Sequence, residues 1–320
     1  MFTGIGSVGA ARRLQSAAVL RRLLLLPKRP LAAVFCTAVL LVGSPADFIF
    51  AGEPIGKPST SRSARDEALR VIPLDKLPAE ARGKVTAVLD NVSLYRRLPI
   101  QSIDCEPDMF RFIMDNPDVM VNMWRVMGVT NVSLDRVDAN HFRCTDGDGT
   151  TARVEVLLRT PQLQIIFAEG LYDGPLFPRP IRGQCVAVLQ YTTNRKASGR
   201  FEETAQLDTF LHVDNFGVEL LTKLFQGLVG RTIDHNFVET VSFIGSVSRT
   251  AELNPRGMRH MAARLDRVDS DRREQLVAVS DQVAGKLAGV KYSEDEENPP
   301  LSEIVQSTAV DAPAGKASKR

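Results

Sequence analysis

The stretch from residue 131 to residue 170, NVSLDRVDANHFRCTDGDGTTARVEVLLRTPQLQIIFAEG, decides the fold of this 320-residue chain. Apolar and polar side chains alternate along it, which is typical of β-strands with one buried face. Asp146-Gly147-Asp148-Gly149 interrupts the alternation with residues that favour a tight hairpin turn. The stretch therefore predicts consecutive antiparallel strands. The expected strands are 132–137, 141–145, 152–159 and 163–169.

The same alternation continues on both sides of this stretch. Two more strands are expected at 184–191 and 201–213, and a short first strand at 98–105. The connection from 172 to 182 is longer than the others and contains three prolines. Together these runs predict a curved sheet of about seven antiparallel strands.

Apolar residues at helical spacing occur before, within and after the strand block. Asn116-Pro117 divides one helical block in two, because the residue before a proline is disfavoured in the α conformation. Gly230 separates two later helices, since glycine is common directly after a helix end. The sequence therefore predicts an α+β fold, a sheet with a long C-terminal helix and extra helices at both ends of the chain. The expected helices are 76–97, 107–115, 118–127, 216–229, 233–253 and one or two within 258–290.

The first 51 residues read as a leader. They carry six Lys or Arg and one Asp, a net charge of +5, and an apolar run at 31–43 follows Lys28 and Arg29. A positive segment followed by a short apolar run is typical of a secretory signal peptide. We expect the chain to be exported, periplasmic or extracellular, or to be membrane-associated through this segment as an anchor. A mitochondrial presequence is the alternative, because 10–26 contains arginines and no acidic residue.

Composition gives the other boundaries. Residues 52–66 are rich in Pro, Ser and Gly, which is typical of a linker. The last 30 residues are acidic at first and then rich in Pro, Ala and Lys, which predicts disorder. The expected organisation is a leader 1–51, a linker 52–75, a helical lead-in 76–97, an α+β domain 98–253, a helical extension 256–290 and a disordered tail 291–320.

The charge balance and the cysteines exclude several classes of protein. The whole chain carries a formal charge of +2 and the leader +5, so the remainder has −3 and no basic excess for nucleic acid. Three cysteines follow the leader, too few for a disulfide scaffold and too irregular for a zinc site. A Cys144–Cys185 bridge and three buried thiols, the third being Cys105, both stay open as alternatives.

Sequence motifs for catalysis are weak. The dinucleotide fingerprint at 4–9, GIGSVG, has no strand before it and lies in the leader. His212 with Asp214, or Asp234 with His235, could form a general base and its orienting carboxylate. Local hydrogen bonds and helix capping explain the same residues more simply. We expect no catalytic residue, no metal and no cofactor.

The order of strand, helix pair, strand meander and long C-terminal helix resembles the START/Bet v 1 helix-grip superfamily. The segments that carry the resemblance are 98–105, 108–127, 132–213 and 216–253. The resemblance implies a curved sheet around a long helix, with an apolar cavity between them for a lipid or another hydrophobic small molecule. The residues that we expect to line this cavity are Phe112, Met123, Trp124, Phe167, Tyr172, Phe177, Tyr191, Phe210 and Phe225.

Three functional hypotheses follow. The first is an exported, non-enzymatic protein that binds a hydrophobic small molecule or lipid in this cavity. The alternative is a cell-envelope interaction protein that binds a protein partner through 256–290 and holds no ligand. The second alternative is a cyclase-like or hydratase-like enzyme that uses His212 or Asp234 in the same cavity. The size of the inner space and the partners of these two side chains separate the hypotheses.

Overall fold

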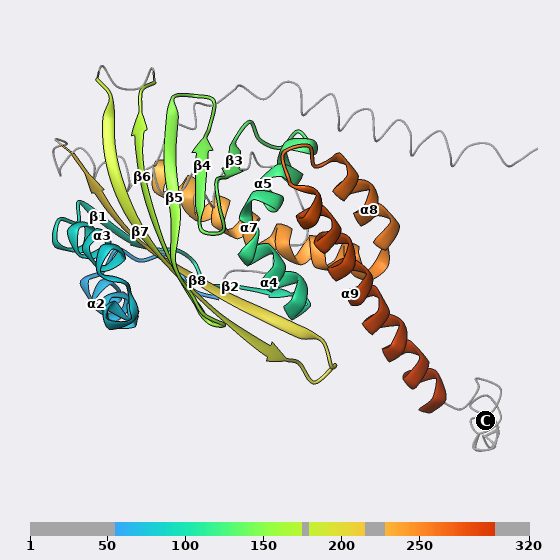
Figure 1. The fold of residues 1–320 in the computed structure, drawn as a ribbon. Helices are drawn as coiled ribbons and strands as arrows, with labels where there is room; N and C mark the ends of the chain where they lie inside the picture. Colours follow the sequence, from blue (N-terminus) through green and yellow to red (C-terminus); the bar gives the residue numbers. More distant parts are fainter. Residues whose placement is uncertain (1–54, 175–178, 215–227, 298–320) are drawn as a thin grey trace, which may run out of the picture. The chain divides into compact units, whose positions relative to one another are not determined.

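The computed structural model describes residues 55–174, 179–214 and 228–297 (Figure 1). Within them the chain forms one curved, open antiparallel sheet with α-helices before, within and after it, so the predicted α+β class is confirmed. The strand order is β1-β8-β7-β6-β5-β4-β3, and β2 also pairs with β8. The strands are β1 (Leu94–Arg97), β2 (Gln101–Asp104), β3 (Ser133–Arg136), β4 (His141–Thr145), β5 (Thr150–Arg159), β6 (Leu163–Tyr172), β7 (Ile181–Arg195) and β8 (Phe201–Val213).

The central strands lie close to their predicted bounds, because their alternation is clear. The turn between β4 and β5 contains Gly147 and Gly149, whose φ angles of 76° and 112° favour glycine. The first strand differs from its prediction. The run expected at 98–105 contains β2 alone. Strand β1 lies in the segment expected to be helical, 76–97, where α3 already ends at Asp90, and Pro99 separates the two strands because a proline has no N–H for the ladder.

The predicted break at Asn116-Pro117 is present, since α4 ends at Asp115 and α5 begins at Pro117. The chain after residue 254 forms two helices, where the sequence predicted one or two. Most of the helix expected at 216–229 lies outside the described residues. The break expected at Gly230 is wrong, since α7 runs without interruption through Gly230 from Leu228 to Leu253. The α-helices are α2 (Arg62–Val71), α3 (Ala79–Asp90), α4 (Pro107–Asp115), α5 (Pro117–Val126), α7 (Leu228–Leu253), α8 (Pro255–Arg264) and α9 (Ser270–Glu297).

Helix α2 lies where the composition indicated a linker. The hydroxyl oxygen of Ser61 accepts a hydrogen bond from the backbone N–H of Ala64 at 3.2 Å and so caps the helix. Ala64, Ala68 and Ile72 recur at four-residue spacing and are buried. The linker was predicted because the segment is rich in Pro, Ser and Gly. Its short stripe of small apolar residues nevertheless packs α2 against the rest of the fold.

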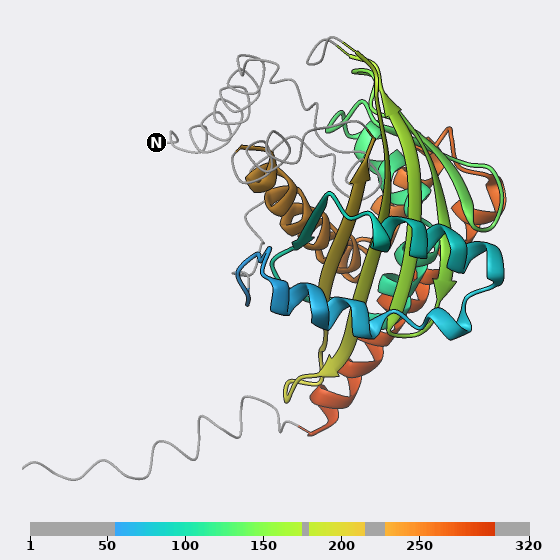
Figure 2. The same ribbon diagram turned by 90° about the vertical axis from the view of Figure 1, so that its left-hand side faces the viewer.

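Helices cover both faces of the sheet. Helices α2 and α3 lie on one face, which we name the outer face (Figures 1 and 2). Helices α4, α5 and α7 lie on the opposite, inner face, and α8 and α9 pack against α7, with α9 also against α4. The extra helices expected before the sheet therefore form the outer layer.

Helix α7 lies beneath one edge of the sheet. Its Asp234 forms an ion pair with Arg96 of β1. A Cβ atom at Gly245 would lie 3.4 Å from the backbone oxygen of Asp104 at the end of β2, so the helix and this strand approach closely. The helix therefore follows β1 and β2, whereas the resemblance implies that it crosses the centre of the sheet.

Two of the three cysteines in the folded part are buried thiols. Cys105 and Cys144 are 1% and 0% exposed. Burial raises the pKa of the Cys144 thiol to about 12, so the thiolate is not formed at neutral pH. The Cys144–Cys185 bridge, which the sequence left open, is therefore not formed. Cys185 is disulfide-bonded, so the alternative of three buried thiols is wrong as well.

Candidate functional site

The predicted cavity residues lie in different places. Phe177 and Phe225 are outside the described residues. Phe167 and Phe210 lie on the outer face, in an apolar cluster with α2 and α3. There the ring of Tyr95 lies 5.1 Å from that of Phe210, measured between centroids. These two phenylalanines therefore hold the outer helices against the sheet and do not face the inner side.

Three other predicted residues lie on the inner side. The ring of Trp124 on α5 lies 5.5 Å from Phe243 of α7, and the ring of Tyr191 on β7 lies 5.3 Å from Phe110 of α4. Met123 on α5 is 1% exposed. These side chains pack the inner helices against each other and against the sheet.

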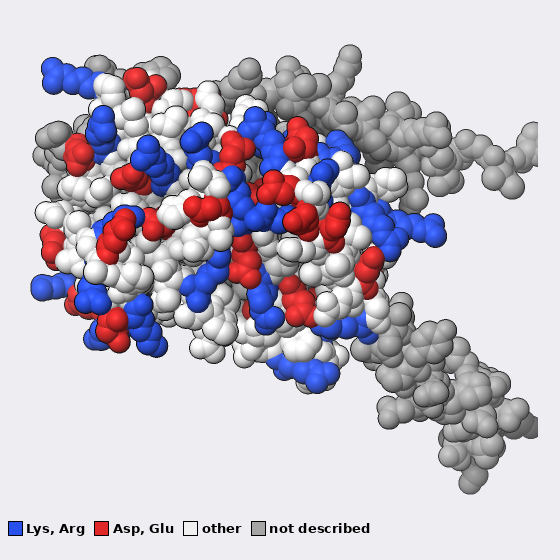
Figure 3. All heavy atoms as spheres, in the orientation of Figure 1, with Lys and Arg blue, Asp and Glu red and all other residues white. Residues whose placement is uncertain are grey.

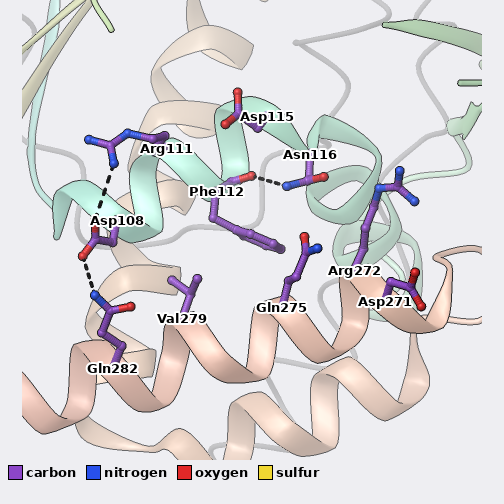
Figure 4. Close-up of a pocket in the computed structure, with 10 residues that line it drawn as sticks. All are labelled: Asp108, Arg111, Phe112, Asp115, Asn116, Asp271, Arg272, Gln275, Val279 and Gln282. Carbon is purple, nitrogen blue, oxygen red and sulfur yellow. Dashed lines mark hydrogen bonds and ion pairs between the residues drawn. The ribbon is translucent and has the colours of Figure 1, made fainter. Parts of the chain in front are cut away.

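Phe112 lies at a groove between α4 and α9, which Figure 4 shows in close-up. The groove has a volume of about 520 Å³. Asp108 on its rim accepts hydrogen bonds from Gln282 at 2.9 Å and from Lys286 at 2.7 Å. Helix α9 thus uses one face to cover α4, and binding of a partner through 256–290 stays a prediction.

Side-chain size on the inner face decreases along the central strands. Near α4 the cross-strand row is Gln164, Leu189 and Leu207. Towards the ends of β5 and β6 that lie near Tyr172 the rows contain alanine, glycine and cysteine. We name six of these positions the small-residue patch. They are Cys144, Ala152, Gly170 and Gly183 in one row and Ala168 and Cys185 in the next.

The half of the inner face near α4 and α5 is filled. The gap between Met120 of α5 and the strand residues Phe142 and Ile166 has a volume of about 20 Å³. That volume is about the space of one water molecule. A hydrophobic ligand does not fit there. The small-residue patch has the shorter side chains, and Cys144, Ala152, Ala168 and Cys185 within it are buried, at 0–4% exposed.

Tyr172 belongs to the same end of the sheet as the patch. It is paired with Thr150 of β5 and Ile181 of β7, and it is 6% exposed. A Cβ atom at Gly174 would lie 2.4 Å from its hydroxyl oxygen, so a glycine is required beside the ring. Of the nine predicted residues, Tyr172 is the one that the strand register places beside the patch.

Comparison with known proteins gives likeness in structure only. No model of a known family matches the chain, and no curated protein matches its sequence. A conserved protein from Geobacillus kaustophilus is 13% identical, with a TM-score of 0.33 over 46% of this chain and 92% of that one. An uncharacterised protein from Rhizobium leguminosarum is 13% identical, with a TM-score of 0.28 over 45% and 95%. Ara h 8.0201, a Bet v 1-like protein, is 9% identical, with a TM-score of 0.24 over 45% and 99%.

These scores are too low to argue function. The antiparallel sheet is consistent with a helix-grip arrangement. The candidate site must therefore be judged on its own residues.

A buried ion pair fixes the α4–α5 break to β3. The guanidinium of Arg136 donates hydrogen bonds to Asp118 at 2.5 Å and to the side-chain oxygen of Asn116 at 3.1 Å. It also lies 4.7 Å from the centre of the Phe142 ring. Because the side chains of Arg136 and Asp118 are only 9% and 4% exposed, this pair holds α5 in place and keeps the filled half of the inner face closed.

Glu203 is a buried carboxyl group on β8. One of its oxygens accepts a hydrogen bond from the hydroxyl of Thr193 at 2.7 Å, and the other has no hydrogen-bond partner among the described residues. Burial raises the pKa of Glu203 above its ordinary value of 4.5. The group therefore stabilises the fold most below that value, and its contribution is lost as the pH rises through the folded-state pKa.

We expect Glu203→Gln to raise the free energy of unfolding at pH 7 by about 1 kcal/mol, because an amide pays no cost of burying a charge. At pH 4 the variant and the wild type should be closer in stability. Urea unfolding at both pH values measures the difference. Equal differences at pH 4 and pH 7 would show that the carboxyl group does not titrate over this range.

Of the two pairs in the enzyme hypothesis, Asp234 and His235 have other partners. Asp234 pairs with Arg96, and His235 lies 4.0 Å from Glu239 on the same helix. A ring nitrogen of His212 lies 2.7 Å from the backbone oxygen of Asn91. Its other ring nitrogen lies 3.2 Å from Asp214, so this pair of the enzyme hypothesis is in contact. Both contacts of His212 are to residues at the edge of the sheet, as expected for local hydrogen bonds.

The described part of the chain contains neither of two other kinds of feature. No group of three or more His, Cys, Asp or Glu side chains there is arranged to hold a metal ion. Within the same residues, no helix has both the length and the apolar character needed to cross a membrane. On the face drawn in Figure 3, side chains of both charges are interspersed.

Proposed function

We propose that this chain is a non-enzymatic binding protein that holds a hydrophobic small molecule or lipid against the small-residue patch. The single observation that carries the proposal is the change in side-chain size along the inner face. One half has Leu, Ile and Phe side chains and is filled by α4 and α5. The other half has six small residues in two neighbouring rows, one of them the disulfide-bonded Cys185, and the second row continues into Val154 and Phe142 of the filled half.

The dimensions of the patch suit such a ligand. Its longer row crosses four strands, β4 to β7, and neighbouring strands lie about 4.8 Å apart, which gives a width of about 14 Å. Two rows on one face are about 7 Å apart along the strands. An acyl chain or a fused ring system has these dimensions, and the patch offers it an apolar surface.

The leader supports a place of action outside the cytoplasm. Its positive residues, apolar run and small residues are those of an export signal or a membrane anchor. We therefore propose that the ligand is taken up in the cell envelope or outside the cell. Helix α7 follows β1 and β2 at the edge of the sheet, whereas the patch lies on β4 to β7.

The test is to identify what the purified chain carries. The full chain is purified without detergent, extracted with chloroform and methanol, and the extract is analysed by mass spectrometry beside a native mass spectrum of the protein. We expect one hydrophobic molecule per chain, or uptake of one molecule after incubation with a lipid mixture. A native mass equal to that of the bare chain under both conditions would contradict the proposal.

A further inference from the structure

A second hollow lies on the other side of β1, between that strand and α2. It has a volume of about 620 Å³ and is separate from the small-residue patch, which is on the inner face. We name it the α2–β1 groove. Its lining residues are Thr60, Arg62, Arg65, Asp66, Leu69, Val92, Ser93, Leu94, Tyr95 and Arg96.

The groove contains an open edge of the sheet. Strand β1 is at the end of the strand order, and its neighbour on one side is β8. The N–H of Leu98 donates to Leu207 of β8, whereas the N–H and C=O of Arg97 bond to Ser59 on the opposite side. Backbone groups alternate in direction along a strand, so those of Tyr95 point to the same side as those of Arg97. They are therefore directed towards the groove.

The chain itself shows that this edge accepts an added strand. Ser59 and Arg97 exchange two backbone hydrogen bonds of 2.9 and 2.8 Å in an antiparallel bridge. Beyond Ser59 the chain turns into α2 and leaves the edge. An extended segment placed beside Tyr95 would make the next pair of bonds of the same kind, which is the way that peptides add to an exposed sheet edge.

The positive charge of the groove favours an acidic peptide segment. Arg62 and Arg65 line it from α2, and among the described residues neither has a carboxylate within ion-pair distance. The first turn of α2 contains no acidic residue, so the helix N-terminus adds to the positive potential. Arg96 is already neutralised by Asp234, and Asp66 is the one acidic residue of the lining.

Apolar side chains complete the groove. Leu69, Val92 and Leu94 line it and are each half-buried. They offer a place for an apolar side chain of the segment, beside the two arginines. Alternate residues of an extended peptide point to opposite sides, so acidic and apolar residues in alternation match the groove.

We propose that the α2–β1 groove binds an extended, acidic segment of a partner protein, which pairs with Tyr95 of β1 and places carboxylates on Arg62 and Arg65. The free backbone groups of the edge favour an extended peptide as the ligand, and the two arginines favour a peptide that is acidic. This interaction is independent of the ligand at the small-residue patch, since the two sites lie on opposite faces of the sheet.

The test uses a fluorescein-labelled peptide of ten residues in which valine and glutamate alternate, titrated with the full chain and followed by fluorescence anisotropy. We expect saturable binding. Arg62→Glu combined with Arg65→Glu should weaken it by about tenfold or more, because two attractive charge pairs become repulsive. The matched control, Arg70→Glu with Lys76→Glu, changes the charge equally outside the groove and should alter binding less than twofold.

Two further probes separate strand addition from attraction to any polyanion. A twin peptide that is N-methylated at alternate amides keeps its charge but loses strand hydrogen bonds, and it should bind about tenfold more weakly. Heparin and phosphatidylglycerol vesicles should not compete. The proposal is overturned by absence of saturable binding, by equal binding of the methylated twin, or by heparin or vesicles that displace the peptide.

Discussion

Replacing Asp208 by alanine should lower the free energy of unfolding by about 3–5 kcal/mol, the cost of removing one member of a buried ion pair. Asp208 of β8 is 0% exposed. Its carboxylate accepts hydrogen bonds from Arg97 at 2.8 Å and from the hydroxyl of Tyr95 at 2.5 Å. Without it the hydroxyl of Tyr95 loses its acceptor and the guanidinium of Arg97 loses its buried carboxylate partner.

This network joins three parts of the fold. Arg97 also donates to Glu67 of α2 at 2.8 Å and to the backbone oxygen of Ala64 at 3.1 Å, so Asp208 holds the arginine that holds α2. Burial raises the pKa of Tyr95, so its hydroxyl stays protonated and donates to Asp208 at neutral pH. Loss of the carboxylate should therefore loosen α2 as well as lower overall stability.

Urea unfolding followed by circular dichroism measures the change, and Glu67→Gln is the control. Glu67 makes its bond to the same arginine from the surface, where water screens the charge, so this variant should unfold nearly like the wild type. Equal and small effects of the two substitutions would contradict the assignment of Asp208 as the centre of the network.

The second large effect concerns the small-residue patch. Ala152→Leu combined with Ala168→Leu should abolish binding of a hydrophobic ligand while the stability of the free protein stays the same or rises. The added side chains would occupy the space that the ligand uses. If protein atoms already filled that space, overpacking would instead cost about 1–3 kcal/mol for each substitution.

Ala205→Leu is the matched control for this prediction. Ala205 is paired with Tyr191 on β7 in the filled half of the inner face, and it is 3% exposed. The same change of side chain there should destabilise the protein by about 1–3 kcal/mol. Thermal unfolding of the three proteins compares the two halves of the face directly. A loss of stability in the patch variant as large as in the control would show that the patch is not hollow.

The strands and most helices could be predicted because their periodicity is strong. The bounds of β4 and β8 agree with the alternation of apolar residues, and Pro117 marked the break between α4 and α5. Helix α2 was missed because its stripe uses alanines, which carry little apolar signal, next to a stretch rich in Pro, Ser and Gly. The composition of the neighbouring segment therefore led to a linker prediction, although the alanines of α2 recur every four residues.

The cavity residues were chosen for their size, and the strand period corrects that choice. Phe167 and Tyr172 are five residues apart in β6, so they point to opposite faces. The same period contains the signal for the patch. Small residues alternate in β6 and β7, at Ala168 and Gly170 and at Gly183 and Cys185. The proposed ligand site therefore rests on where small residues recur, which a choice by size overlooks.

The position of α7 could not be derived from its own sequence. The sequence of an amphipathic helix shows which of its faces is apolar, but it does not show which strands that face packs against. That choice depends on contacts between residues far apart in the chain, such as Arg96 with Asp234. The helix-grip resemblance therefore gave the class of fold and the order of elements, and the structure was needed to place the helix beneath β1 and β2.

The most direct measurement is a titration of a fluorescent fatty acid into the wild-type chain, the Ala152→Leu/Ala168→Leu variant and the Ala205→Leu control. The account predicts one saturable site per chain in the wild type and in the folded control, and none in the patch variant. Equal binding by all three proteins would place the ligand elsewhere, and no binding by the wild type would show that the small side chains of the inner face do not form a ligand site.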